Sequence, residues 1–122
     1  MFTQRKYFGT PEYDRVCKRL IAIANARGSP ISYAEIFEIM GLRRGNYAAK
    51  ESGHMLGEIN EQMHSEGKPM ISALVVNQKE KMPGRGFFKL AVVLGKLTRR
   101  ATRRREKVFW ENELTAVYST TW

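Results

Sequence analysis

The sequence predicts an α+β domain in which three helices precede a short β-hairpin and a C-terminal helix. Three observations favour this fold class. Apolar residues recur at three- and four-residue steps in the first half, a run of β-forming residues follows at 69–76, and helical apolar spacing returns near the C-terminus. With 122 residues, 43% of them hydrophobic, the chain has the size and apolar content of a single domain over 1–122.

The first helix has a clear start signal after a short basic lead-in at 1–9. Thr10 supplies a hydroxyl N-cap, Pro11 suits the first helical position, and Glu12 adds an early acid. We expect the helix to end near Gly28. Its inward face is predicted to comprise Tyr13, Val16, Cys17, Leu20, Ile21 and Ala24.

Two further helices are predicted on either side of a basic turn. Ser32 and Glu35 have the spacing of a capping box, and Gly41 is suited to end the short helix that they begin. After a polar connection at 42–47, a longer helix is predicted from about 48 to 66. Its inward residues would be Met55, Leu56, Ile59 and Met63.

The second half is predicted to form the hairpin. Residues 69–76 resemble a strand buried on both faces, and 77–86 form a polar loop with Pro83, Gly84 and Gly86 as turn residues. Residues 87–94 return as a short strand or a helix, and 108–118 form the last helix. Three helices followed by a two-stranded hairpin are typical of a winged-helix-like domain.

Charge is the strongest functional signal. There are 21 Lys and Arg against 12 Asp and Glu, giving a net charge of +9, which favours a polyanionic partner. Arginine dominates the run at 96–107, and its fork of donors favours bidentate phosphate contacts. The alternative to phosphate binding is that this run is a solvated, partly disordered connection between elements. The basic residues of this run are Lys96, Arg99, Arg100, Arg103, Arg104, Arg105 and Lys107.

Two smaller groups complete the candidate nucleic-acid interface. At the entry to the third helix, side chains would face a DNA groove in a helix-turn-helix; the alternative is a polar loop with a packed tyrosine. In the glycine-rich loop, a basic tip would act as a wing; the alternative is a structural turn. The first group is Arg43, Arg44, Asn46, Tyr47 and Lys50, with His54 further along the helix, and the second is Lys79, Lys81 and Arg85.

The sequence offers no catalytic or metal motif. Cys17 belongs to an apolar helix face with no activating residue beside it in sequence. His54, Glu58 and His64 do not form a recognisable ligand set, because one histidine–carboxylate pair is too few for a metal site. We predict a protein that is not an enzyme and that has no cofactor.

Targeting signals are also absent from the sequence. A single cysteine excludes an internal disulfide and fits a reducing compartment. No apolar run approaches the ~20 residues that span a bilayer, and residues 1–13 lack the apolar centre of a secretory signal. We expect a cytoplasmic protein without a membrane partner.

Nearly the whole chain carries a pattern that resembles a family of small uncharacterised phage and bacterial proteins. The pattern comprises LGEI at 56–59, GKPMISALVVN at 67–77 and MPGRGFF at 82–88. The C-terminal segment at 109–118 is similar to the tail of these proteins. This resemblance implies no activity.

A second pattern resembles the winged-helix domain of alkyltransferase-like DNA-binding proteins. ISYAEI at 31–36 is similar to the opening of their helix-turn-helix, and VVN at 75–77 to the stretch after their active-site motif. His54 stands where that family has an intercalating arginine, and Leu74 and its neighbours replace the Pro-Cys-His-Arg setting. The resemblance implies the fold and DNA contact, and its departures argue against alkyl transfer.

The sequence therefore predicts a nucleic-acid-binding module, with double-stranded DNA favoured over RNA. The third helix would enter the major groove and the loop at 78–86 would act as the wing. An alternative is a phage-type interaction protein that binds an acidic host protein or blocks a nucleic-acid-handling complex. A nuclease has only the charge in its favour.

Overall fold

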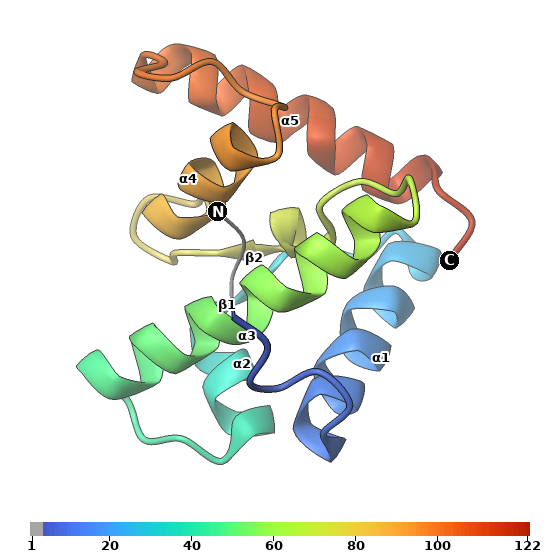
Figure 1. Cartoon of the computed structure of the whole chain (residues 1–122), viewed down its shortest axis with the longest axis vertical. Coiled ribbons are helices and arrows are strands. Elements are labelled where there is room, and N and C mark those ends of the chain that lie inside the picture. Colours follow the sequence, from blue (N-terminus) through green and yellow to red (C-terminus); the bar gives the residue numbers. More distant parts are fainter. Residues whose placement is uncertain (1–3) are drawn as a thin grey trace.

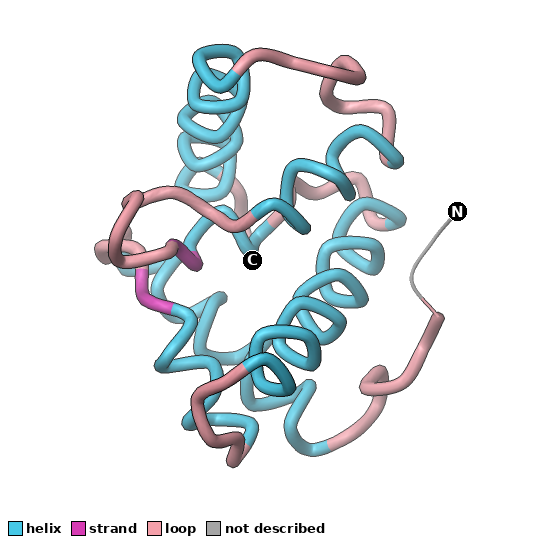
Figure 2. Tube along the Cα trace, turned by 90° about the vertical axis from the view of Figure 1, so that its left-hand side faces the viewer, coloured by secondary structure: helices cyan, strands magenta, loops and turns pink. Residues whose placement is uncertain are grey.

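The computed structural model describes residues 4–122 and is mostly helical, with a small two-stranded parallel sheet (Figure 1). Apart from two short strands, the described chain consists of helices and loops (Figure 2). The elements are α1 (Pro11–Ala26), β1 (Ile31–Ser32), α2 (Tyr33–Met40), α3 (Asn46–Ser65), the 3-10 helix η1 (Ile71–Leu74), β2 (Val75–Val76), α4 (Arg85–Val93) and α5 (Arg103–Ser119). None of these helices is both long and apolar enough to cross a membrane.

The first three helices are confirmed, with one change at a helix start. Thr10 caps α1 by accepting a hydrogen bond from the Tyr13 amide at 3.2 Å. Gly41 ends α2 in the left-handed conformation, with φ 70°. The capping box is wrong, because the Ser32 side chain makes no cap hydrogen bond and Glu35 instead accepts from Arg19 Nε at 2.6 Å.

The predicted hairpin is wrong. Only Val75 and Val76 of the run at 69–76 form a strand, and they pair in parallel with Ile31 and Ser32. The loop after β2 is closed by a single antiparallel bridge, Asn77 to Met82, and the return segment is the helix α4. Buried residues at 87, 88, 90 and 91 have helical spacing, which settles the choice that the sequence left open there.

The 3-10 helix η1 lies at the centre of the core. All four of its residues are buried, and it contacts α1, α3 and α5 (Figure 1). A segment covered on every side has the same apolar pattern whether it is a strand or a tight helical turn. That ambiguity explains why the sequence predicted a longer strand.

The C-terminal helix α5 is confirmed and is tied to the same centre. Trp110 Nε1 donates to the Ala73 carbonyl at 2.9 Å, and the buried Glu113 carboxylate accepts from the Met70 amide at 2.9 Å. The basic run is divided by this helix: 96–102 remains a connection, and 103–107 forms the first turn of α5. Thr102 caps that turn by accepting from the Arg105 amide at 3.2 Å.

A buried polar pair joins α3 to η1. Asn60 donates from Nδ2 to Ser72 Oγ at 2.6 Å and accepts from the Ser72 amide at 3.1 Å. Both residues are almost fully buried. A buried donor that loses its partner costs its full desolvation penalty, so this pair matters for stability out of proportion to its size.

We expect Asn60→Ala to lower the free energy of unfolding by about 2–3 kcal/mol, because it leaves the Ser72 amide buried without an acceptor. Urea unfolding followed by circular dichroism measures the change. Gln62→Ala, two residues along the same helix in an exposed hydrogen bond, is the matched control and is expected to change stability little. A loss of less than about 0.5 kcal/mol in Asn60→Ala would contradict the importance of the pair.

Candidate nucleic-acid interface

The turn between α2 and α3 and the start of α3 present their basic and polar side chains to solvent. Arg43, Arg44, Asn46 and Lys50 are exposed, and Tyr47 is 65% exposed. The alternative of a packed tyrosine is therefore wrong. Within residues 4–122, the three basic side chains of this group form no ion pair, so their charges are available to a partner.

This end of α3 shares a groove with the loop that follows β2. The groove has a volume of about 740 Å³ and is bounded by α2, α3, the loop and the start of α4. Arg44, Lys50 and Arg85 line it, together with Asn77 and Gln78. No aspartate or glutamate is among its described lining residues, so the groove favours negatively charged or neutral groups.

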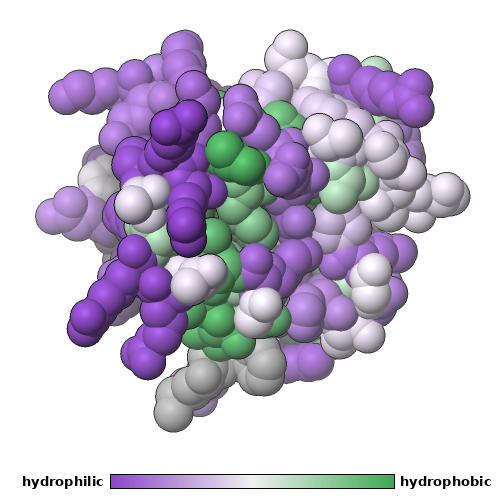
Figure 3. All heavy atoms as spheres, turned by 90° about the horizontal axis from the view of Figure 1, so that it is seen from above, coloured by the Kyte–Doolittle hydropathy of each residue, from purple (hydrophilic) through white to green (hydrophobic). Residues whose placement is uncertain are grey.

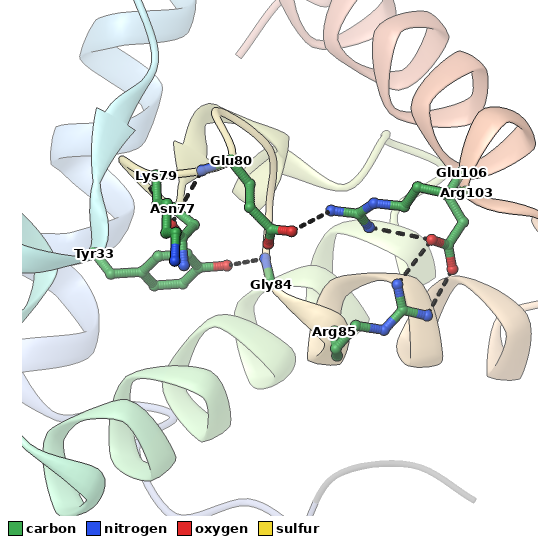
Figure 4. A network of polar contacts seen from close by, with 8 residues as sticks. All are labelled: Tyr33, Asn77, Lys79, Glu80, Gly84, Arg85, Arg103 and Glu106. Atoms are coloured by element: carbon green, nitrogen blue, oxygen red, sulfur yellow. Dashed lines mark hydrogen bonds and ion pairs between the residues drawn. The ribbon is translucent and has the colours of Figure 1, made fainter.

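The loop itself is tightly built. The Asn77 amide donates to the Met82 carbonyl and the Lys81 amide to the Asn77 carbonyl, each at 2.7 Å, while Asn77 Oδ1 accepts from the Lys79 amide at 2.8 Å. At the end of the loop, Gly84 donates to the Tyr33 hydroxyl at 2.8 Å (Figure 4). Lys79 and Lys81 are exposed, so the loop presents two cations on a fixed backbone.

Two of the candidate arginines, although exposed, are bound to carboxylates of the protein itself. The guanidinium of Arg85 donates to both carboxylate oxygens of Glu106 at 2.7 and 2.6 Å, and Arg103 donates to Glu106 at 3.2 Å and to Glu80 at 3.3 Å (Figure 4). Arg85 beside Glu106, with Arg103 adding to it, holds the pKa of this buried carboxyl below its ordinary value of 4.5. Sequence separation concealed this network, since Glu106 lies 21 residues from Arg85.

Four other arginines are free of such partners. Arg99 and Arg100 line a hollow of about 500 Å³ between α4 and the start of α5, and Arg104 and Arg105 are exposed on the first turn of α5. In the described part of the chain none of the four forms an ion pair. Hydrophilic side chains gather on the side where α5 begins, beside a strip of hydrophobic surface (Figure 3).

The position of these charges opposes a local preference. The first turn of a helix carries the positive end of the helix dipole and favours acidic side chains. Here Arg103, Arg104 and Arg105 precede the one acid of that turn, Glu106. Arg103 offsets this cost through its contacts with Glu106 and Glu80, whereas Arg104 and Arg105 have no such contact in the described residues.

Lys89 is a functional candidate that the sequence analysis missed. It is exposed and lines the same hollow as Arg85, Arg99 and Arg100. Its position four residues after Arg85 places both on one face of α4. That spacing would have identified Lys89 if the helix had been recognised from sequence.

His54 lies apart from both the groove and the hollow. Its Nε2 is 2.6 Å from the Gln4 carbonyl oxygen and 3.2 Å from Glu58 Oε2. Glu58 is buried and also accepts from the amides of Tyr7 and Phe8, each at 2.9 Å. These contacts fasten the N-terminal segment onto α3, and the structure does not bring His54 together with the basic candidates.

Cys17 and possible metal ligands are the remaining chemical candidates from the sequence. Cys17 is half-buried, and burial raises the pKa of its thiol to about 11, so the thiol stays protonated near neutral pH. Residues 4–122 contain no group of three or more histidine, cysteine or acidic side chains placed to hold a metal ion.

Comparison of the chain with models of protein families, with curated proteins and with solved structures found no match. The two resemblances drawn from the sequence therefore stay predictions.

We expect Glu106→Gln to lower the free energy of unfolding at pH 7 by about 1–2 kcal/mol, because two arginines lose a charged acceptor. A carboxyl with a lowered folded-state pKa contributes stability above its unfolded pKa and loses it as the pH falls through the folded value. The difference from wild type should therefore shrink below about pH 4.5.

Urea unfolding between pH 7 and pH 3 measures this difference. Glu111→Gln, at an exposed position on the same helix, is the control and should match wild type across the range. A gap between wild type and Glu106→Gln that stays constant down to pH 3 would show that the carboxylate charge is not what stabilises the network.

Proposed function

We propose that the protein binds nucleic acid through the phosphate backbone, with duplex DNA favoured over RNA, and that it catalyses no reaction. One observation carries this proposal: Arg99, Arg100, Arg104 and Arg105 lie around the start of α5, and within residues 4–122 none of them forms an ion pair. Unneutralised arginines attract a polyanion, and each phosphate that they bind releases condensed counterions.

The exposed start of α3 supports duplex DNA as the form of nucleic acid. An α-helix fits the major groove of B-form DNA, whereas the major groove of an RNA helix is too deep and narrow for it. We propose that α2, the turn at 41–45 and α3 act as a helix-turn-helix in a winged-helix-like arrangement. Arg43, Arg44 and Asn46 would then reach base edges, with Tyr47 and Lys50 at the backbone.

The loop at 77–84 takes the place of the wing in this proposal. It borders the same groove as the start of α3, which supports a common face for the two elements. Lys79 and Lys81 would contact phosphates on either side of the groove that α3 enters. Arg85 and Arg103 would contribute less, because Glu106 already binds both.

We expect Arg104→Glu/Arg105→Glu to reduce the affinity for duplex DNA at least about tenfold at low salt and to lower the slope of log K against log salt by about two. Acidic residues at these positions suit the helix start, so folding should be preserved. Fluorescence anisotropy from about 50 to 200 mM salt measures the effect.

Arg15→Glu/Lys18→Glu on α1 is the matched control, because it makes the same change in net charge at another exposed surface. If both double variants lose affinity equally, binding follows total charge rather than this surface. Failure of the wild-type protein to bind duplex DNA, single-stranded DNA and RNA at low salt would overturn the proposed function.

The helix and the loop are expected to differ in what they read. Arg43→Ala/Arg44→Ala should change the set of sequences enriched from a random duplex pool, because these side chains would reach base edges. Lys79→Gln/Lys81→Gln should lower the affinity for all DNA sequences alike, because phosphate contacts carry no direct sequence information. Sequencing of the selected pools measures both effects, and an unchanged preference in the first variant would rule out base reading by the turn.

A further inference from the structure

The groove between α3 and α4 differs in chemistry from the arginine-lined hollow. Its lining includes Phe37, Leu56, Val76, Phe87 and Leu90, and most of these side chains are buried in the wall. Three cations are among its described lining residues: Arg85 is bound to Glu106, whereas Arg44 and Lys50 form no ion pair within residues 4–122. The groove is therefore an apolar trough with two unpaired positive charges and no described acid.

These properties fit a protein segment better than a nucleic-acid backbone. Phosphates and sugars gain little from an apolar floor, and four unpaired arginines are available to them elsewhere on the molecule. An apolar groove of several hundred cubic ångströms with a few placed polar groups is typical of a ligand site. Positive charge on its lining selects partners that carry carboxylates.

The form of the partner follows from the backbone around the groove. An extended peptide binds by adding to a free strand edge, but the described sheet has only two strands of two residues each. A helix instead places apolar side chains at three- and four-residue steps into a groove and needs no backbone pairing. The α3 side of the groove also leaves space, because a Cβ atom at Gly53 would meet nothing within 4 Å.

We propose that this groove is a docking site for an acidic amphipathic helix of another protein. Leucine- or phenylalanine-type side chains of that helix fill the apolar floor, and its carboxylates face Arg44 and Lys50. The apolar contacts supply most of the affinity, while the two charges orient the helix and exclude basic competitors. The groove shares Arg44 and Lys50 with the proposed helix-turn-helix, so an acidic helix and a DNA duplex would compete for these two side chains. The phosphate contacts proposed for the arginines around the start of α5 involve other residues.

The test uses a fluorescein-labelled designed peptide of about four helical turns, with leucines along one face and glutamates flanking them. A second peptide carries lysine at every glutamate position. Anisotropy titrations with the full chain should show binding of the acidic peptide and at least tenfold weaker binding of the basic one. Arg44→Ala/Lys50→Ala should reduce the affinity for the acidic peptide, so that the affinities for the acidic and the basic peptide become more similar.

Gly53→Leu fills the groove and should lower the affinity for the acidic peptide at least tenfold. Ala22→Leu, an enlargement at an exposed position of α1 outside the groove, is the matched control and should bind as wild type does. Gly86→Leu is the second groove-filling variant, because a Cβ there also meets open space. Amide chemical shifts of the wild-type protein give a readout that needs no variant, with the largest peptide-induced changes expected around Gly53, Gly84 and Gly86.

Three results would overturn the proposal. They are no binding of the acidic peptide up to about 1 mM, binding that both groove-filling variants leave unchanged, and peptide-induced shifts confined to the α5 surface. A loss of duplex or single-stranded DNA binding in Gly53→Leu, without any peptide binding, would assign the groove to nucleic acid instead. Peptide binding without DNA binding would sustain this inference while the proposed function fails.

Discussion

The structure depends on one short buried segment, the 3-10 helix η1. Three helices pack on it, and each supplies a bond or a surface: Asn60 from α3 bonds to Ser72, and Trp110 and Glu113 from α5 bind Ala73 and Met70. Its four side chains are buried against α1 as well. This segment fixes α1, α3 and α5 in relation to one another, and α4 packs on α3, which sets where the groove and the hollow lie.

Four glutamates of the described chain are buried and serve the interior of the fold. Glu51, Glu58, Glu106 and Glu113 are nearly inaccessible, and each accepts hydrogen bonds from cations or backbone amides inside the fold. Glu51, Glu106 and Glu113 each neutralise at least one basic side chain, and the arginines that they do not reach keep their charge at the surface. Net charge alone does not reveal which basic side chains are paired in this way.

The sequence predicted the helices well because their signals are local. Thr10, Gly41 and the spacing of Met55 with Ile59 each act within one or two turns of helix. The hairpin was wrong because burial on all sides removes the difference between strand and 3-10 periodicity. The candidate interface was predicted as three groups of basic residues with Asn46, Tyr47 and His54, but not with their ion pairs. Which arginines are free depends on Glu106, whose contacts with Arg85 arise from tertiary packing.

The parallel pairing of β1 with β2 has a consequence for synthesis of the chain. Ile31 pairs with Val75, so the parallel sheet cannot form until more than half of the protein has been synthesised. Until η1 has emerged, α1 and α3 also lack the segment on which they pack. A nascent chain ending near residue 66 could form the contacts among α1, α2 and α3, but the faces of α1 and α3 that pack on η1 would stay exposed, as in a partly folded intermediate.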